Sequence, residues 1–420
     1  MKKLILTLFI YIITITPSNS QSFDLIAGTG TSGYSGDGGD AINSELNRPR
    51  HLVFDAVGNL YFADQKNHVI RKIDVNGIIS TIAGNGSLGY SGDNLQANSA
   101  QLNNPRGVCI DVDGNILIAD SGNHVIRKID LNGIITTIGG NGSSGFSGDN
   151  GLATSAQLNS PRGVHTDNLG NIYIPDTSNH RVRKIDTNGI ISTIAGNGSN
   201  GYSGDGGLAT NAGFETPYDV ITKDNTIYIA DIGDGSIRKI NSSGIVSTII
   251  NDDGIHIIGN PTAIHFDNND NLFISDLSGK IYKIDTLENT TLVFDNEIGS
   301  AGGIGFDINF NLYYSDTFAN QIKKIDNALL KTNDWSLVNK LKIFPNPTQE
   351  YINIDISDFP EFENVYLYDS NGKLIQIKND ENFKIKNNNN SVKIKLNSPG
   401  IYFVKVKSKK SIITKKIIKY

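Results

Sequence analysis

Four glycine-rich segments of the chain each contain an aromatic residue followed by Ser-Gly-Asp. An aromatic ring beside a carboxylate suits the recognition of polar ligands such as sugars. The carboxylate is also a ligand for Ca²⁺, although one sure carboxylate per segment falls short of the roughly six to eight oxygens that Ca²⁺ takes. No other cofactor or metal is expected. The paired residues are Tyr34 and Asp37, Tyr90 and Asp93, Phe146 and Asp149, and Tyr202 and Asp205.

A structural role for the same residues is the alternative. Each segment leads into a short stretch such as Leu152–Leu158, which is typical of a helical turn. The Asp would then accept hydrogen bonds from the first backbone N–H groups of that turn, and the aromatic ring would pack over its alanine and leucine. Because nearly identical residues recur in all four segments, we favour this capping role and leave the binding role open.

Three arginines form a second group of candidates, because each follows a proline that opens an apolar strand. They are Arg50, Arg106 and Arg162. A guanidinium group matches a carboxylate or phosphate in geometry and can hold it with two parallel hydrogen bonds. Three such groups at one place would hold an anionic ligand. The alternative is that they pair with neighbouring acidic residues or with solvent.

The elements that carry these residues are repeated along the chain. An Ile-x-Gly anchor recurs at a step of 56 residues, at Ile26, Ile82, Ile138 and Ile194, and shorter copies begin near Pro261 and Ala301. In the second copy, apolar alternation predicts strands over 107–110, 116–119, 125–129 and 134–138. Four-stranded sheets in series are typical of propeller blades. The six copies therefore predict an all-β fold with a six-bladed β-propeller.

A ring of blades must close, and the two ends of the repeat region show how. The sixth copy ends with a third strand near 321–325, whereas 23–26 is a spare strand ahead of the first copy. We predict that this N-terminal strand completes the last blade, which removes two exposed sheet edges. Because strand direction alternates, the loops before each innermost strand share one face, called the upper face below. The three arginines are then expected at the upper mouth of the central channel.

Several stretches of the second copy resemble NHL repeats: Pro105-Arg-Gly-Val108, Asp111-x-x-Gly-Asn-Ile-Leu-Ile-Ala-Asp120 and Asn123-His-Val-Ile-Arg-Lys-Ile129. The resemblance covers residues 23–326 and implies a six-bladed propeller. Some propellers of this kind are lyases or lactone hydrolases that use a metal in the central channel. Such chemistry needs several polar side chains converging there, and the innermost strands supply no obvious set at Val53, Cys109, His165, Ile221, His265 and Gly305.

The remaining polar residues indicate architecture rather than catalysis. An Asp recurs in all six copies, at Asp64, Asp120, Asp176, Asp231, Asp276 and Asp316, and should bond the loop after it. His68, His124 and His180 lie at equivalent positions of different blades, too far apart to share a metal. The single cysteine, Cys109, excludes an internal disulfide framework and is expected to be buried and inert. The chain contains no Ser-His-Asp order, nucleophile elbow, phosphate loop or HExxH motif.

The two ends of the chain predict export. Two lysines precede a short apolar run at residues 4–15, which predicts a signal peptide over residues 1–20 and is too short for a good membrane span. The propeller is expected over 21–326, a linker over 327–340 and a small β-sandwich over 341–420, where strand-like alternation resumes.

The C-terminal motifs resemble the type A sorting domain of the type IX secretion system. They comprise Phe344, Pro345, Asn346 and Pro347, then Gly400 and Tyr402, then Lys415 and Lys416. The resemblance implies that the secretion machinery of Bacteroidetes-type bacteria takes the chain across the outer membrane. The mature protein would then be secreted or attached to the cell surface, with no transmembrane segment.

Charge is divided unequally along the chain. Residues 21–340 carry 21 Lys and Arg against 35 Asp and Glu, a net charge of −14, whereas residues 341–420 carry a net charge of +6. An acidic repeat region disfavours nucleic-acid binding, which needs Lys and Arg to displace counterions. The sequence therefore predicts a secreted, non-catalytic module that binds an extracellular protein or glycan. The alternative is a metal-dependent lyase or lactone hydrolase with its site in the central channel.

Overall fold

A computed structural model describes residues 23–250, 258–295 and 299–325, together with strands of the C-terminal region between residues 342 and 419. The expected signal peptide and linker, and Pro345–Pro347 of the sorting motif, lie outside the described residues. Within the described residues, no helix is long and apolar enough to cross a lipid bilayer.

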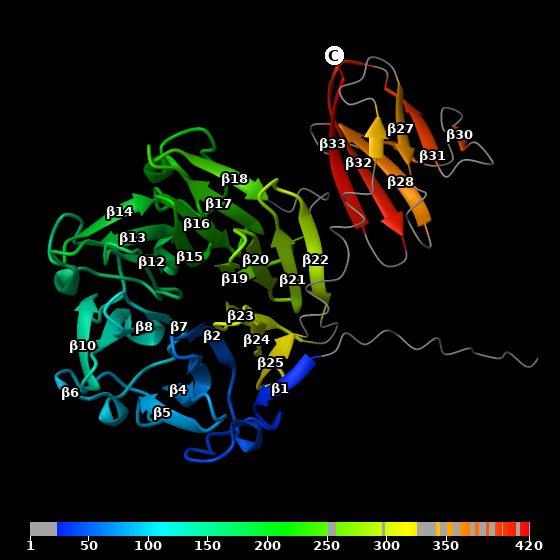
Figure 1. The fold of residues 1–420 in the computed structure, drawn as a ribbon. Helices are drawn as coiled ribbons and strands as arrows, with labels where there is room; N and C mark the ends of the chain where they lie inside the picture. The colour runs from blue at the N-terminus through cyan, green and yellow to red at the C-terminus, as the bar shows by residue number, and fades with distance from the viewer. Residues whose placement is uncertain are drawn as a thin grey trace, which may run out of the picture.

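Six antiparallel sheets stand in a ring, as the repeats predict (Figure 1). The first three blades consist of β2 (Pro49–Phe54), β3 (Leu60–Asp64), β4 (Val69–Ile73) and β5 (Ile79–Ala83); β7 (Gly107–Ile110), β8 (Ile116–Asp120), β9 (Val125–Ile129) and β10 (Ile134–Gly139); and β11 (His165–Thr166), β12 (Ile172–Asp176), β13 (Arg181–Ile185) and β14 (Ile191–Ala195). A short strand, β6 (Leu95–Gln96), pairs with the outer edge of the second blade.

The next three blades consist of β15 (Pro217–Lys223), β16 (Thr226–Asp231), β17 (Ser236–Ile240) and β18 (Val246–Ile250); β19 (Pro261–Phe266), β20 (Leu272–Asp276), β21 (Lys280–Ile284) and β22 (Thr290–Asp295); and β23 (Ala301–Phe306), β24 (Leu312–Asp316) and β25 (Gln321–Ile325) with β1 (Phe23–Ala27). The innermost strand of each blade is the first in sequence, so β2, β7, β11, β15, β19 and β23 surround the central channel.

The N-terminal strand closes the ring, as predicted. β1 pairs antiparallel with β25, with Phe23 opposite Ile325 and Asp24 opposite Lys324. The Lys324 ammonium lies 2.7 Å from the Asp24 carboxylate, and Ala27 is fully buried. The last blade therefore has its fourth strand from the opposite end of the propeller, and no edge of that sheet stays open at β25.

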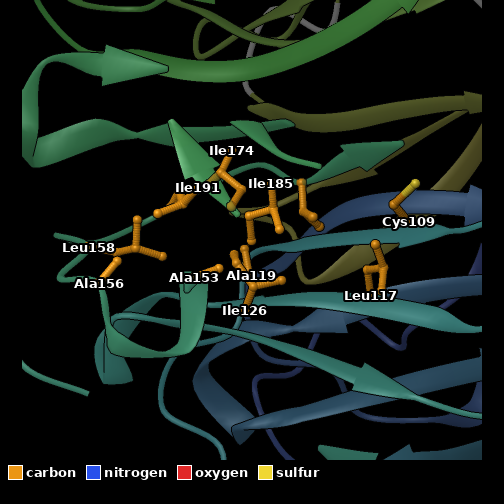
Figure 2. Packing of buried hydrophobic residues seen from close by; sticks show 11 residues of the cluster. Cys109, Leu117, Ala119, Ile126, Ala153, Ala156, Leu158, Ile174, Ile185 and Ile191 are labelled. Atoms are coloured by element: carbon orange, nitrogen blue, oxygen red, sulfur yellow. The ribbon is translucent and has the colours of Figure 1, made fainter. Parts of the chain in front are cut away.

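Each hydrophobic core lies between two neighbouring blades. Figure 2 shows Leu117 and Ile126 of the second blade with Ile174 and Ile185 of the third, next to Leu158 from the loop that joins them. Alternation along each strand directs every second side chain toward a neighbouring sheet, which is why the apolar residues recur at a period of two. Burying a residue such as Ile174 contributes about 1.5–3 kcal/mol, so the blades stabilise one another in series.

The turns follow the residues that the sequence offers. At the turn between β9 and β10, Gly133 has φ of +79°, a conformation that costs glycine least. On the upper face, the four long loops each contain one turn of 3-10 helix, Ala41–Asn43, Ala97–Ser99, Ala153–Ser155 and Ala209–Asn211. These turns lie where the sequence predicts a helical segment.

The C-terminal region contains two four-stranded sheets. One has the order β26 (Lys342–Phe344), β27 (Tyr351–Asp355), β31 (Ser391–Lys395), β30 (Lys384–Ile385), and the other β29 (Leu374–Ile377), β28 (Phe362–Asp369), β32 (Gly400–Ser408), β33 (Ile412–Lys419). Ile354 and Ile394 of the first sheet and Val365 and Val404 of the second are fully buried. Two sheets with buried alternate residues are the expected β-sandwich.

Candidate functional site

The Asp of each upper-face loop binds an arginine rather than the helical turn behind it. In the first blade, Asp37 lies 2.8 Å from Nη2 of Arg71, and the 3-10 turn that follows has no side-chain cap. The capping interpretation is therefore wrong. The guanidinium satisfies the carboxylate, and the backbone carbonyl of Ser35 accepts a second bond from Arg71 at 3.0 Å. The same Arg–Asp pair recurs at Arg127–Asp93, Arg183–Asp149 and Arg238–Asp205, at 2.7–2.8 Å.

The aromatic residue of each loop lies over the same guanidinium and not over alanine and leucine. The Arg71 guanidinium carbon lies 5.3 Å from the centre of the Tyr34 ring, and the Tyr34 hydroxyl lies 3.0 Å from Thr81 Oγ1. Equivalent contacts join Arg127 to Tyr90 and Arg238 to Tyr202. A ring over a desolvated cation contributes about 2 kcal/mol. One side of each ring is thus used to hold the loop, while about two fifths of the residue stays exposed (43% for Tyr34).

Phe146 lacks the hydroxyl of its counterparts, and its loop is held differently. Its ring lies 3.8 Å from the Arg181 guanidinium and 4.9 Å from that of Arg183. Thr193, which would meet a tyrosine hydroxyl, donates instead to Asp149 at 2.7 Å. The loop keeps its anchor although one hydrogen-bonding partner is missing.

Arg71, Arg127 and Arg183 also reach a buried Asp of the recurring column, at 3.3–3.7 Å, whereas Nη1 of Arg238 donates to the Gly213 carbonyl oxygen at 3.3 Å. Arg71 Nη1 lies 3.4 Å from Asp64, whose carboxylate accepts a hydrogen bond from the Asn47 backbone N–H at 2.7 Å. Burial raises the pKa of Asp64 to about 6, against the hydrogen bonds from Asn47 and Asn67 and the charge of Arg71, which lower it. The side chains of Asp64 and Arg71 are fully buried, whereas Asp37 is half-exposed. The chain Asp64–Arg71–Asp37 therefore ties an exposed loop to the inside of its blade.

The arginines of the third strands were not predicted as part of the loops. They are Arg71, Arg127, Arg183 and Arg238, and the fifth and sixth blades have Tyr282 and Lys323 at the equivalent positions. The signal was available: the arginine occurs in the four copies that have the long loop and is replaced in the two that lack it. Because the arginine and the long loop occur in the same four copies, the sequence indicates that the arginine contacts the loop.

Calcium addition is expected to leave the stability of the protein unchanged. Each loop carboxylate already contacts a guanidinium, and that charge repels a divalent cation. Thermal melts of the purified chain with EDTA and with millimolar Ca²⁺ measure this. A higher melting temperature in Ca²⁺ that is abolished by Asp93→Asn would contradict the expectation.

At the centre of the upper face, the structure places the three predicted arginines around one recess. The lining includes Arg50, Arg106 and Arg162 with Tyr218, Thr262 and Gly302, which occupy the equivalent positions of the other blades. Arg106 Nη1 donates to the Tyr218 hydroxyl at 3.1 Å, and the Arg162 guanidinium lies 4.9 Å from the centre of the Tyr218 ring. Arg50 Nη1 lies 3.5 Å from the same hydroxyl. Three positive charges thus meet at one phenol.

Tyr218 is the residue that organises the recess, and it occupies the repeat position that is an arginine in the first three blades. Burial alone would raise the pKa of Tyr218, but the charges of Arg50, Arg106 and Arg162 outweigh burial and lower it. Burial lowers the pKa of Arg50, and the neighbouring charge of Arg106 lowers it further. The guanidiniums therefore repel one another, and an anion between them would relieve that repulsion.

The arginines of the recess have no acidic partner among the residues that the structure describes. None of them has a carboxylate oxygen within the 4.0 Å limit of an ion pair. The carboxylate nearest in the lining, Asp219, accepts hydrogen bonds from the backbone N–H groups of Val220 and Ile264, both at 2.9 Å, and lies 3.7 Å from His51 Nε2. The Asp219 carboxylate thus contacts these backbone groups and His51, and it forms no ion pair with the arginines. Within the described part of the chain, pairing with acidic neighbours, the alternative for these arginines, does not occur.

The recess is small. Its volume is about 10 Å³, close to what one water molecule occupies. Arg50 is almost fully buried and is held by Gln65, whose Oε1 accepts from its Nε at 2.8 Å. The site therefore has room for one oxygen of a protruding carboxylate, while the rest of a ligand would lie on the upper face.

The histidines and the cysteine take up structural positions. His124 Nδ1 accepts a hydrogen bond from the Ser160 backbone N–H at 3.1 Å, and His68 does the same with Asn104, so each joins its blade to the loop of the next. Cys109 is buried, and burial raises the pKa of its thiol to about 11. Among the described residues, no three His, Cys, Asp or Glu side chains lie close enough to hold one metal ion.

Comparison with known proteins agrees with this architecture. Residues 342–420 match the model of a secretion system C-terminal sorting domain. Residues 16–91, 86–146 and 141–203 match the model of the teneurin NHL domain. The chain is an NHL-type propeller protein with a C-terminal sorting domain. An NHL propeller that carries such a sorting domain is secreted or attached to the cell surface.

The individual relatives each match only part of this chain, and the match covers only a small part of the curated relatives. Teneurin-1 of Mus musculus is 28% identical over 279 residues, which cover 59% of this chain and 10% of teneurin-1. The chain thus spans about a tenth of the length of the teneurins that it matches. Among solved structures, a protein of unknown function from Bacteroides thetaiotaomicron has a TM-score of 0.51 at 16% identity, covering 73% of this chain and 75% of that chain. A streptogramin B lyase has a TM-score of 0.46 at 14% identity, covering 68% and 95%. The Bacteroides thetaiotaomicron protein shows the fold alone.

The sorting-motif residues that the structure describes lie on strands. Phe344 ends β26, Gly400 and Tyr402 lie on β32, and Lys415 and Lys416 lie on β33. Tyr402 is buried, and its hydroxyl contacts Ser398 at the turn that precedes β32. This contact holds the Ser-Pro-Gly turn against β32, the strand that carries Gly400 and Tyr402.

Proposed function

We propose that the NHL propeller is a non-catalytic binding module that recognises an extracellular protein or glycan through a carboxylate. The observation that carries the proposal is the convergence of Arg50, Arg106 and Arg162 on Tyr218, without a carboxylate partner among the described residues. Buried positive charges without a counter-ion are costly, and a ligand carboxylate would supply one. Export by the sorting domain places the site where such ligands occur.

The charges around the recess support an anionic ligand over a neutral one. The rest of the repeat region is acidic, so a patch of three arginines at the channel mouth stands out from its surroundings. Guanidinium groups hold a carboxylate with paired hydrogen bonds, which also fix its orientation. The half-exposed rings of the upper-face loops contact the third and outermost strands, and they offer flat surfaces to the outer part of a large ligand: Tyr34, Tyr90, Phe146 and Tyr202.

Two pairs of polymers test the function directly. We expect the full-length protein to bind immobilised polygalacturonate or poly-glutamate but not methyl-esterified pectin or poly-glutamine, because only the first of each pair carries carboxylates. The polymer that binds identifies the partner class as glycan or protein. Binding that does not distinguish an acid from its neutral counterpart would contradict the proposal.

Two arginine variants test the site. Arg106→Gln and Arg162→Gln should each weaken binding of the acidic polymer about tenfold or more, because each removes a charge-assisted hydrogen bond. Arg48→Gln is the matched control, since Arg48 is an exposed arginine on the same face that contacts Phe318 and not the recess. Equal losses in all three variants would mean that net charge alone governs binding.

A further inference from the structure

The lower part of the central channel contains a second cavity, which the arginine site does not use. Its volume is about 270 Å³, and it is lined by residues of the innermost strands β2, β7, β11, β15 and β19 and by Val164. The strand residues below the arginines line it, so it lies toward the opposite end of the channel from the recess. Most of its wall is aliphatic, as at Val53, Val164 and Ile221.

The histidines and the cysteine of this wall have shifted pKa values. At His51, burial lowers the pKa, but the charge of Asp219 and the hydrogen bonds to Asp219 and Val108 outweigh burial and raise it. Burial lowers the pKa of His165 to about 4, and its Nε2 lies 3.1 Å from Thr222 Oγ1. Burial also lowers the pKa of His265 and keeps the Cys109 thiol protonated. The lining contains no Asp, Glu, Lys or Arg. Such a wall disfavours a charged ligand and suits an apolar one with a single polar group.

His265 presents a directed hydrogen-bond acceptor in this cavity. Its Nδ1 lies 2.8 Å from the carbonyl oxygen of Phe266, and a carbonyl can only accept, so Nδ1 carries the proton. Nε2 is then the acceptor of the neutral ring, and it has no hydrogen-bond partner among the described residues. The ring lies 5.5 Å from that of Phe306, which restricts its orientation.

The lower entrance to the channel is partly apolar. Four of the six turns that follow innermost strands have an exposed aliphatic residue: Val57, Val112, Leu169 and Ile308. The turns after β15 and β19 have exposed polar residues instead, among them Asp224 and Asp270. An approaching molecule with apolar surface would meet the aliphatic side chains before it enters the cavity.

We propose that the lower channel binds a small uncharged aromatic alcohol, one ring with a hydroxyl that donates to His265 Nε2. The volume of about 270 Å³ lies between the roughly 150 Å³ of an apolar cavity that takes benzene and the roughly 300 Å³ or more of drug-sized ligands, so the cavity suits one ring with small substituents. The acceptor decides for a hydroxyl, since a purely apolar ligand would leave Nε2 unpaired. The linings of this site and of the recess at the upper mouth have only His51 in common.

Calorimetric titration of the full-length protein with p-cresol and with p-xylene tests the proposal. The two molecules have nearly the same shape and differ in one hydroxyl. We expect both to bind with saturation and p-cresol to bind about tenfold more tightly, the value of one hydrogen bond. Absence of saturable binding would show that the channel holds only water and would overturn the proposal, as would equal affinities for the two molecules.

Two variants locate the site. His265→Phe should reduce p-cresol affinity about tenfold and leave p-xylene affinity within twofold. A preference for p-cresol that persists in His265→Phe would overturn the assignment of the acceptor. Val53→Phe fills the cavity without altering His265, and both molecules should then fail to bind; unchanged binding would place the ligands elsewhere and overturn the proposal.

Discussion

Deletion of residues 21–27 is expected to lower the melting temperature of the propeller by about 10 °C or more. The deletion removes β1, and with it several backbone hydrogen bonds to β25, worth about 1 kcal/mol each, and the buried side chain of Ala27. A loss of about 5 kcal/mol corresponds to a shift of this size in a domain of roughly 300 residues. The exposed edge of β25 would also promote aggregation. Differential scanning calorimetry measures the shift.

A relocated strand is the control for this deletion. In this variant the same segment is inserted after Asp326 behind an Asn-Gly turn. It would then follow β25 directly in the sequence and pair with it as a hairpin, as the outermost strand pairs with the third strand in the other blades. We expect this variant to recover most of the lost stability. A melting curve that the deletion leaves unchanged would show that β1 does not hold the ring closed.

Substitution of Arg71 by methionine is expected to destabilise the protein by about 3–5 kcal/mol. The change leaves the fully buried Asp64 without its cationic partner, and breaking a buried ion pair from one side costs that much. It also releases Asp37 and Tyr34, so amide hydrogens between residues 28 and 46 should exchange faster. Chemical unfolding and hydrogen exchange measure the two effects separately.

The partners of Arg71 supply the controls. Asp64→Asn in the Arg71→Met background should restore part of the stability, because it removes the unpaired buried charge. Asp37→Asn alone should cost about 1 kcal/mol or less, since Asp37 is half-exposed. If Arg71→Met and Asp37→Asn had the same small effect, the buried link from blade to loop would not exist.

Much of the fold could be predicted because the same pattern of strands and turns recurs in six copies of the repeat. The strands of the second blade lie within one residue of their predicted bounds, and the N-terminal strand was recognised because the sixth copy lacks its fourth. Periodicity of two and Asn-Gly turns are local signals that burial reinforces in every blade. The sandwich was predicted from the same alternation.

The candidate site was less accessible because its contacts are long-range. Arg50 and Tyr218 are separated by 168 residues and meet only when the ring closes. In the sequence, the replacement of the repeated arginine by Tyr218 in the fourth copy suggests that the arginine site is lost there. In the structure, the three arginines contact the Tyr218 side chain. The capping interpretation failed for a similar reason. A carboxylate next to a helical turn has a local partner at hand, but the buried cation of the third strand provides a stronger one.

The most direct test of the account is the NMR signal of the arginine side chains in the full-length, arginine-labelled protein during titration with citrate, a small carboxylate. The account predicts that the Nε–H resonances of Arg50, Arg106 and Arg162, assigned through single Arg→Lys variants, shift with saturation. Those of Arg71, Arg127, Arg183 and Arg238 should stay in place, because loop carboxylates already hold them. Shifts confined to the loop arginines, or no shift in the three arginines of the recess, would contradict it.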